Sequence, residues 1–473
     1  MKVALVLVLV AGLGAGSGYG AWWSEQASDP GPRAEVSATT ALLSVRRVPE
    51  ALLQPRRDAS VAAGVSTLPD RLPGDSCLVV TEQGRTLFEH EPSTPLIPAS
   101  TQKLLVGATV LQFVEPDAVF ETTVVSTEPV VDGTVSGDVW LVGGGDPLLA
   151  TDDFVARNGD QDRRFTRFES LADAIVEAGI VRIAGSVVGD GTRYDEQRDV
   201  SSWLQRYRDQ VSAGPLSGLV VNQGLVSFTP ERVSVNPGTP ASDPPAHAAS
   251  LLVELLEERG VEVTGGADSG EAPDGATVVA RLESLPVVDV IAHMMQWSDN
   301  TVAELLLKEV GVRGGAEGST VAGGSVVHST LASLGVRGEG LVVADGSGLD
   351  LGNRAHCRAL ADLLDIAGPE SHLASTLAVS AESGTLRDRL VDTPGAGQVS
   401  AKTGSLRHVV AMSGFVSSAN GHTYTFAVIS NLDESEFMPP SGGDLIDELM
   451  LSLATLAPVD VPAELEPLPP RGR

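Results

Sequence analysis

The chain has 473 residues, a formal charge of −30 at pH 7 and a sequence pI near 4.5. This length exceeds the usual size of a single domain, so we expect at least two compact units. The acidic balance and the lack of a basic stripe exclude a nucleic-acid-binding protein, because phosphate binding needs clustered Lys and Arg.

The first 23 residues have the pattern of an export signal. Met1 and Lys2 precede an apolar run from Val3 to Trp23. Small residues at 15–17 offer a cleavage site, yet the run also nearly reaches the roughly 20 residues that span a bilayer. We therefore expect an exported, extracytoplasmic protein that is either secreted or anchored in the membrane by residues 1–23.

The next part of the chain predicts a spacer and the start of a folded body. Residues 24–75 are rich in Ala, Ser, Pro, Arg and Glu, and the body is expected to begin within them, near residue 46. Two short runs, 76–82 and 85–89, flank a turn with Gly84 and predict a β-hairpin. Apolar residues with helical spacing then predict a helix over 103–113.

The middle of the chain, 121–285, alternates Val-rich runs with Gly, Asp and Pro turns. Helical patterns occur within it at 168–178 and 246–259. This alternation predicts separate mixed α and β modules.

The pattern becomes helical again from residue 286. Two Val-rich runs, 408–416 and 422–430, then predict a second hairpin, and 444–456 predicts a last helix. The acidic, Pro-rich residues 461–473 are typical of a disordered tail.

Two cysteines, Cys77 and Cys357, are the only ones in the sequence. Metal sites need several ligands at short spacing, so no metal or cofactor is expected. A disulfide and two separate buried thiols are both compatible with the sequence.

Three short motifs follow one another along the chain: S-T-Q-K at 100–103, S-D-N at 298–300 and K-T-G at 402–404. Residues three apart share a helix face, so Ser100 and Lys103 can form a hydrogen bond. A serine needs a neighbouring base to attack a carbonyl, and a lysine serves if burial or a second cation such as Lys402 lowers its pKa.

The use of lysine supports this interpretation. The chain contains four lysines, Lys2, Lys103, Lys308 and Lys402, and otherwise uses arginine. Arginine stays protonated and cannot act as a base, and here the scarce lysines occupy both motif positions.

The three motifs together resemble those of penicillin-binding proteins and class A β-lactamases. Four further segments, P-A-S-T-Q-K-L at 98–104, G-G-G-D-P at 143–147, D-G-S-G-L at 345–349 and G-T-L at 384–386, extend the resemblance over most of the chain after residue 45. They resemble the class C low-molecular-mass penicillin-binding proteins, the D-alanyl-D-alanine carboxypeptidase/endopeptidase family. Asp350-Leu351 departs from the Ser-Arg that relatives often have, so local substrate contacts do not carry over there.

The resemblance implies an α/β (α+β) fold. A transpeptidase/β-lactamase-like domain, with an antiparallel sheet flanked by helices, is expected from residues 46–120 and 286–460. Mixed α and β domains at 121–285 would be inserted between the first and second motifs, as in that family.

The resemblance also implies catalytic roles. Ser100 would be the nucleophile, Lys103 the base, and Ser298 the relay that passes a proton to the leaving amine. Asn300 would donate a hydrogen bond to the substrate amide, and the backbone N–H groups of Ser100 and Ser405 would form the oxyanion hole.

Further substrate contacts are expected from the third motif and from two isolated residues. Lys402 and Thr403 would bind a terminal carboxylate, and Gly404 would let substrate approach the backbone. Asp146 either caps its own turn or helps to bind the amine of a diamino-acid side chain. Arg354 is a second candidate for substrate binding.

We therefore expect a serine-type D-Ala-D-Ala carboxypeptidase that acts on peptidoglycan stem peptides and is acylated by β-lactams. Endopeptidase activity on cross-links and a broad esterase activity remain alternatives within the same chemistry. A catalytically silent wall-binding or scaffolding protein of the same fold is the alternative from another class.

Overall fold

The computed structural model describes residues 48–157, 163–228 and 238–458. By contacts the chain divides into one unit of residues 1–54 and 461–473 and a second of residues 55–460. The expected export segment and tail lie outside the described residues, as does the first half of the expected spacer. None of the described helices is both long and apolar enough to cross a membrane.

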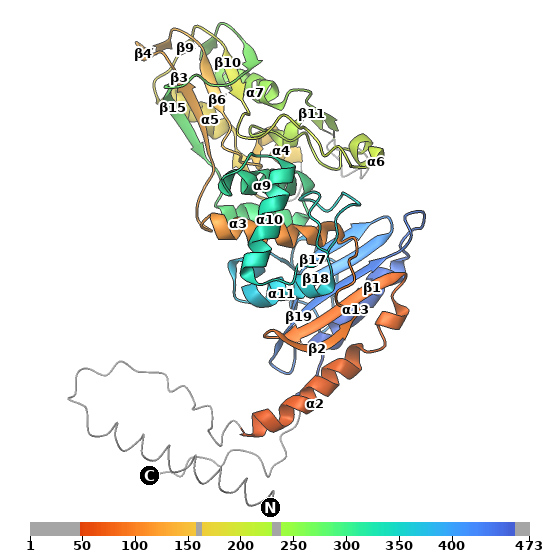
Figure 1. The fold of residues 1–473 in the computed structure, drawn as a ribbon. Helices are drawn as coiled ribbons and strands as arrows, with labels where there is room; N and C mark the ends of the chain where they lie inside the picture. Colours follow the sequence, from red (N-terminus) through yellow and green to blue (C-terminus); the bar gives the residue numbers. More distant parts are fainter. Residues whose placement is uncertain (1–47, 158–162, 229–237, 459–473) are drawn as a thin grey trace, which may run out of the picture. The chain divides into compact units, whose positions relative to one another are not determined.

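Within the second unit, a six-stranded sheet joins the two ends of the chain. Every neighbouring pair in it is antiparallel, which confirms the predicted sheet. Figure 1 shows the orange strands β1 and β2 beside the blue strands β17–β19. The strands, in spatial order, are β16 (Ala378–Val379), β17 (Val399–Leu406), β18 (Val409–Ser417), β19 (Thr423–Asn431), β1 (Asp75–Glu82) and β2 (Arg85–His90).

Helices cover both faces of this sheet. Successive side chains of a strand point to opposite faces, and here the apolar side chains on both faces pack against helices. Cys77 and Val79 of β1 pack into one apolar cluster, and Leu78 and Val80 into another. The first cluster takes residues from α3 (Lys103–Phe113), α8 (Val287–Trp297), α9 (Asn300–Arg313), α10 (Thr320–Leu334), α11 (Cys357–Ala367) and α12 (His372–Ser375). The second takes residues from α2 (Val48–Val65) and α13 (Pro440–Ala454). Part of the segment expected as a spacer is thus a helix that packs on the sheet.

A disulfide links Cys77 of β1 to Cys357 at the start of α11. Both residues are fully buried. Of the two possibilities left open by the sequence, the structure has the disulfide. It fastens the sheet to the helical layer that carries the first two motifs.

The middle of the chain forms mixed sheets with their own apolar core. One sheet has the order β14 (Ala267–Ser269), β10 (Val187–Asp190), β6 (Val139–Val142), β3 (Glu121–Ser126) and β15 (Thr277–Glu283). Another has the order β13 (Glu262–Val263), β9 (Arg182–Ile183), β5 (Thr134–Val135) and β4 (Val130–Val131). The helices α5 (Glu169–Glu177) and α7 (Pro244–Glu258) pack in the same core and match the two predicted helical stretches.

Short elements complete this insertion. They are α4 (Asp152–Arg157), α6 (Gln205–Asp209), β7 (Leu149–Ala150), β8 (Thr166–Arg167), β11 (Leu225–Phe228) and β12 (Gly238–Pro240). A chain segment from about residue 193 to 225 contacts α9 through two partly buried ion pairs. Arg193 is paired with Glu309 at 2.7 Å, and Asp195 with Lys308. These contacts connect the insertion to the helix that carries the second motif.

Candidate active site

Ser100 lies in a tight 3-10 turn, Ala99–Gln102, that leads directly into α3. The turn begins with a left-handed residue, Ala99 at φ 47, and such a conformation costs about 1–2 kcal/mol. A Cβ on Gly348 would lie 2.0 Å from the carbonyl oxygen of Ala99, and a Cβ on Gly404 would lie 2.8 Å from that of Pro98. The side-chain position of Gly404 is therefore occupied by the turn that presents Ser100, and the approach of substrate to the Gly404 backbone stays a prediction.

The side chain of Lys103, one turn after Ser100, is completely buried. Its Nζ lies 3.0 Å from Ser100 Oγ, 2.8 Å from Asn300 Oδ1 and 2.6 Å from the carbonyl oxygen of Ser347. An ammonium has three N–H donors, and each finds an acceptor here. When the amine is neutral, two donors can still bind Asn300 and Ser347, which leaves the lone pair directed at Ser100.

The surroundings of Lys103 favour this neutral state. Burial lowers the pKa of Lys103 to about 8, although the nearby acidic groups of Asp345, Glu304 and Asp299 oppose the shift. Roughly a tenth of the lysine is therefore neutral at pH 7. The geometry and the pKa together fit a general base for Ser100.

The carbonyl of Ser347 is held in place by a loop built on Asp345. Asp345 is fully buried, and its carboxylate accepts five hydrogen bonds. They come from Trp203 Nε1 (2.8 Å), Ser347 Oγ (3.1 Å), Gly348 N (2.8 Å), Asp350 N (2.7 Å) and Asn353 Nδ2 (2.7 Å). The D-G-S-G-L segment thus acts through its backbone, and Trp203 of the insertion helps to hold it.

Glu304 supports the same loop from α9. Its carboxyl group accepts hydrogen bonds from the backbone N–H groups of Gly346, at 3.0 Å, and Ser347, at 2.7 Å. Burial, together with the charge of Asp345, raises the pKa of Glu304 to about 8. Glu304 is therefore mostly protonated at neutral pH, and one helix positions both Asn300 and the Ser347 carbonyl.

The second motif lies at the junction of α8 and α9. Ser298 has a left-handed backbone, φ 56 and ψ 36, where α8 ends. Asp299 then caps α9, since its Oδ1 accepts a hydrogen bond from the N–H of Val302 at 3.0 Å. This turn places Asn300 at the first position of α9, with its Oδ1 directed at Lys103.

Asp299 is ionised in this position. Burial alone would raise the pKa of Asp299, but His293, the Val302 N–H and Arg163 lower it to about 2. Its Oδ2 accepts a hydrogen bond from Gln223 Nε2 at 2.6 Å. The charged cap of α9 is therefore joined to the insertion.

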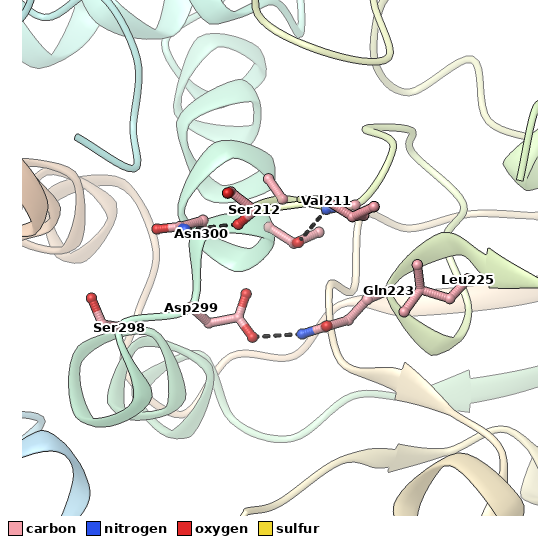
Figure 2. Close-up of a pocket in the computed structure, with 10 residues that line it drawn as sticks. Val211, Ser212, Gln223, Leu225, Ser298, Asp299 and Asn300 are labelled. Atoms are coloured by element: carbon pink, nitrogen blue, oxygen red, sulfur yellow. Dashed lines mark hydrogen bonds between the residues drawn. The ribbon is translucent and has the colours of Figure 1, made fainter. Parts of the chain in front are cut away.

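Two further hydrogen bonds join the insertion to the start of α9 (Figure 2). Asn300 Nδ2 donates to the carbonyl oxygen of Ser212 at 2.7 Å, and the N–H of Gly214 donates to Thr301 Oγ1 at 2.8 Å. A cavity of about 200 Å³ lies among these residues, and Ser298 contributes to its wall. Because Ser212 fixes the amide orientation, Asn300 has one N–H left for a substrate.

The third motif lies on β17. Lys402 is completely buried, and its Nζ donates to the carbonyl oxygen of Thr403 at 2.8 Å. Burial lowers the pKa of Lys402 well below its ordinary value, and the charge of Lys103 lowers it further. The more accessible groups here are the hydroxyls of Thr403 and Thr385, which lie 3.0 Å apart.

Ser405, at the end of β17, is exposed and lies in a cleft of about 640 Å³. Asn300 and Leu349 line the same cleft, and residues of α6 form another part of its wall. The structure thus brings a residue of the second motif and one that follows the third motif to a single cleft.

Two predicted site residues, Asp146 and Arg354, form hydrogen bonds to residues of their own turns. Asp146 Oδ1 accepts a hydrogen bond from the N–H of Leu148 at 2.9 Å, and burial raises the pKa of Asp146 to about 6. Arg354 donates to the carbonyl oxygens of Leu351, at 2.6 Å, and Asn353, at 2.8 Å. Asp146 therefore acts as a turn cap, and substrate contacts of either residue stay a prediction without support from these positions.

The sequence did not predict the Ser347 carbonyl, which contacts Lys103, or the side chains that position that carbonyl. The D-G-S-G-L segment can be recognised in the sequence. Nothing in the sequence, however, indicates that one of its backbone carbonyls contacts Lys103. Glu304 and Trp203 become recognisable only through their contacts with that loop. No cluster of three or more potential metal-ligating side chains occurs among the described residues.

Comparisons with known proteins identify the family. The model of the D-Ala-D-Ala carboxypeptidase 3 (S13) family matches residues 62–242 and 238–450. A D-alanyl-D-alanine carboxypeptidase of Actinomadura sp. is 28% identical over 428 residues, covering 75% of this chain and 77% of that protein. A carboxypeptidase of Mycobacterium tuberculosis is 30% identical over 382 residues, covering 78% and 77%.

The fold has a counterpart among solved structures. Penicillin-binding protein 4 of Haemophilus influenzae superposes with a TM-score of 0.68 at 21% identity, covering 82% of this chain and 98% of that one. The similarity in structure supports the mixed helix and sheet architecture, and the family match covers most of the sequence. The chain therefore belongs to the D-Ala-D-Ala carboxypeptidase 3 (S13) family of penicillin-binding serine peptidases.

Proposed function

We propose that this protein is a serine D-Ala-D-Ala carboxypeptidase that hydrolyses peptidoglycan stem peptides through an acyl-enzyme. The observation that carries the proposal is the Ser100 hydroxyl 3.0 Å from a buried lysine whose pKa is lowered to about 8. Membership of the S13 family and the names of the relatives support the same reaction. β-Lactams would acylate the same serine, because the lactam carbonyl takes the place of the peptide carbonyl.

The reaction begins with a proton transfer. Ser100 Oγ attacks the carbonyl of the penultimate D-Ala while its proton passes to the neutral amine of Lys103. The backbone N–H groups of Ser100 and Ser405 stabilise the oxyanion. When this oxyanion intermediate collapses, the peptide bond breaks. The proton passes from Lys103 through Ser298 to the departing amine. Water then hydrolyses the ester, with Lys103 again the base.

The substrate lies along β17 in this proposal. Its C-terminal carboxylate would face the hydroxyls of Thr403 and Thr385, with Lys402 buried behind them. The remaining N–H of Asn300 donates to an amide of the acyl part. The acyl part would then extend past Ser405 into the larger cleft, which also contains Leu349.

Fluorescent penicillin labelling tests the nucleophile. Ser100→Ala is expected to lose the label, whereas Ser329→Ala, an exposed serine of α10, keeps it. Mass spectrometry of the labelled parent should place the adduct on Ser100. Equal labelling of Ser100→Ala and the parent would refute the assignment, and a failure to label the parent would favour a silent wall-binding protein.

Peptide products test the activity itself. Digestion of a defined peptidoglycan preparation should release free D-Ala, and release of uncross-linked stems would add endopeptidase activity. Recovery of intact stems alone would refute both activities.

We also propose that residues 1–23 direct export, as the charged start and apolar run support. Antibody detection in medium, membrane and cytosol of a bacterial host would test this. A protein confined to the cytosol would contradict it.

A further inference from the structure

Two consecutive residues of the insertion contact the D-G-S-G-L loop behind the proposed base. Trp203 Nε1 donates a hydrogen bond to Asp345 Oδ2 at 2.8 Å. Ser202 Oγ donates a hydrogen bond to Asp350 Oδ2. The two acidic residues are also joined to each other, because the N–H of Asp350 donates to Asp345 Oδ2 at 2.7 Å. The insertion and the loop thus share one hydrogen-bonded network.

Apolar packing surrounds this network. Trp203 is 5% exposed and forms a cluster with Val200, Tyr207 and Leu349. Leu349 belongs to the loop, and the other three residues belong to the insertion. Hydrogen bonds to a carboxylate are stronger than neutral ones, and a buried environment strengthens them further. The contact of Trp203 with the loop is therefore of the strong kind.

The contact also gives a role to Asp350, where local substrate contacts do not carry over from the family resemblance. Asp350 is 5% exposed, and both of its carboxylate oxygens accept hydrogen bonds. Oδ1 accepts from the N–H of Gly352 at 2.6 Å, and Oδ2 accepts from Ser202 Oγ. The side chain of Asp350 thus binds the insertion and the end of the loop together.

The loop presents one acceptor to the proposed base. The carbonyl oxygen of Ser347 lies 2.6 Å from Lys103 Nζ, which is the shortest of the three contacts of this amine. With Ser347 and Asn300 as acceptors, the lone pair of the neutral amine is directed at Ser100. Because that direction depends on where the carbonyl lies, a displaced loop would turn the lone pair away from the nucleophile.

We propose that Trp203 and Ser202 are positioning residues for the acylation step. They act through the loop 345–350, which they hold so that the Ser347 carbonyl orients the amine of Lys103. The insertion thus contributes to the activation of the nucleophile. The proposal rests on the proposed function, in which Lys103 is the base.

Orientation has to be distinguished from an effect of charge. The acidic groups of Asp345, Glu304 and Asp299 raise the pKa of Lys103 against the effect of burial, and Lys402 is the neighbouring cation. A variant that acts only by changing this balance alters the acylation rate below the Lys103 midpoint of about 8 and leaves it unchanged well above that pH. A loss of orientation persists above the midpoint, because the amine is already neutral there.

Replacing Trp203 removes one donor from the network. Trp203→Phe should lower the limiting rate of penicillin acylation about tenfold and leave the dissociation constant of the noncovalent complex nearly unchanged, because a hydrogen bond to a charged group is lost. Replacement of Trp203 by β-(3-benzothienyl)alanine, which keeps the bicyclic ring and lacks the N–H, should give the same loss and preserve the packing. Stopped-flow measurements below and well above the Lys103 midpoint should show this loss at both pH values. Full recovery at the higher pH would overturn the positioning role.

Val200→Ala is the matched control for packing. Val200 is 7% exposed, belongs to the same cluster as Trp203, and has no hydrogen-bonding group in its side chain. The variant should lower the Tm and keep the limiting acylation rate within about twofold of the parent. An equal loss of acylation in Val200→Ala and Trp203→Phe would assign the effect to packing and overturn the proposal.

A double-mutant cycle tests the second contact. Ser202→Ala and Asp350→Ala should each lower the limiting acylation rate, and the double variant should lose no more than Asp350→Ala alone, because directly contacting residues are not additive. Losses that multiply would contradict the shared network. Parental acylation in both Ser202→Ala and Trp203→Phe would refute the positioning role and leave the proposed activity intact. A parent protein that is not acylated would instead refute the proposed function.

Discussion

Asn300 Oδ1 accepts a hydrogen bond from Lys103 Nζ at 2.8 Å, while Nδ2 of the same amide donates to the Ser212 carbonyl at 2.7 Å. One side chain thus connects the proposed base to the insertion. Because an amide oxygen carries no net charge, it orients the amine and stabilises its protonated form less than a carboxylate would.

The pH dependence of acylation follows from the lowered pKa of Lys103. Its neutral fraction increases as pH rises toward about 8 and then saturates, so the acylation rate should increase about tenfold per pH unit below that point. Asn300→Asp places a carboxylate on the amine and should move the midpoint up by about one unit or more. Stopped-flow penicillin acylation across the pH range would measure both, and a flat parent profile would exclude Lys103 as the base.

Lys103→Arg keeps the charge but removes the titrating amine. Acylation should fall by about 10³-fold, within the range for loss of a general base. Lys308→Arg is the matched control, because Lys308 is also completely buried and paired with Asp195. Both variants need a thermal denaturation curve, and near-parental acylation by a folded Lys103→Arg protein would place the base elsewhere.

Lys402→Ala tests whether Lys402 binds the terminal carboxylate of the substrate or acts only through its charge on Lys103. If Lys402 helps to bind the terminal carboxylate, the loss in kcat/KM should be about tenfold larger for a peptide acid than for its amide. Thr403→Val should show the same asymmetry, because its hydroxyl is the more accessible group. An equal loss on acid and amide would leave Lys402 only its electrostatic coupling to Lys103.

Glu304→Gln tests the protonated carboxyl behind the active site. The folded pKa of about 8 exceeds the ordinary 4.5, so the folded state binds the extra proton between these values. The free energy of unfolding therefore falls as pH rises from about 4.5 to 8. Glutamine does not titrate, so the variant's Tm should change less over this window than the parent's. Glu258→Gln, on the exposed face of α7, is the control, and parallel Tm profiles for parent and Glu304→Gln would contradict the assignment.

Local patterns predicted much of the fold. The helix at 103–113 and both hairpins occur where their periodicity places them, because these elements form between neighbouring residues. The parallel pairing of β10 with β6 and β14 depends on distant segments and has no local signal. The helix within 48–65 was missed because its alanine-, proline- and arginine-rich composition resembles a spacer.

The site was predictable where chemistry demands a residue type at a fixed spacing. Ser100 and Lys103 are such a pair, and their hydrogen bond follows from one helical turn. The groups around them depend on tertiary contacts: the Ser347 carbonyl is a backbone atom, and Arg206 reaches the cleft from the insertion. Only the folded arrangement reveals such contributions.

The six-stranded sheet can form only when the last strands of the chain are available, because β1 pairs with β19. Asp75 of β1 is in register with Asn431 of β19. β1, which precedes Ser100 in the sequence, therefore pairs with a strand from the other end of the chain. The disulfide, which joins residues 280 positions apart, has the same dependence. Loops this long make strand pairing slow. Until β19 is available, β1 has no partner on that edge, so the sheet that supports the turn of Ser100 is incomplete.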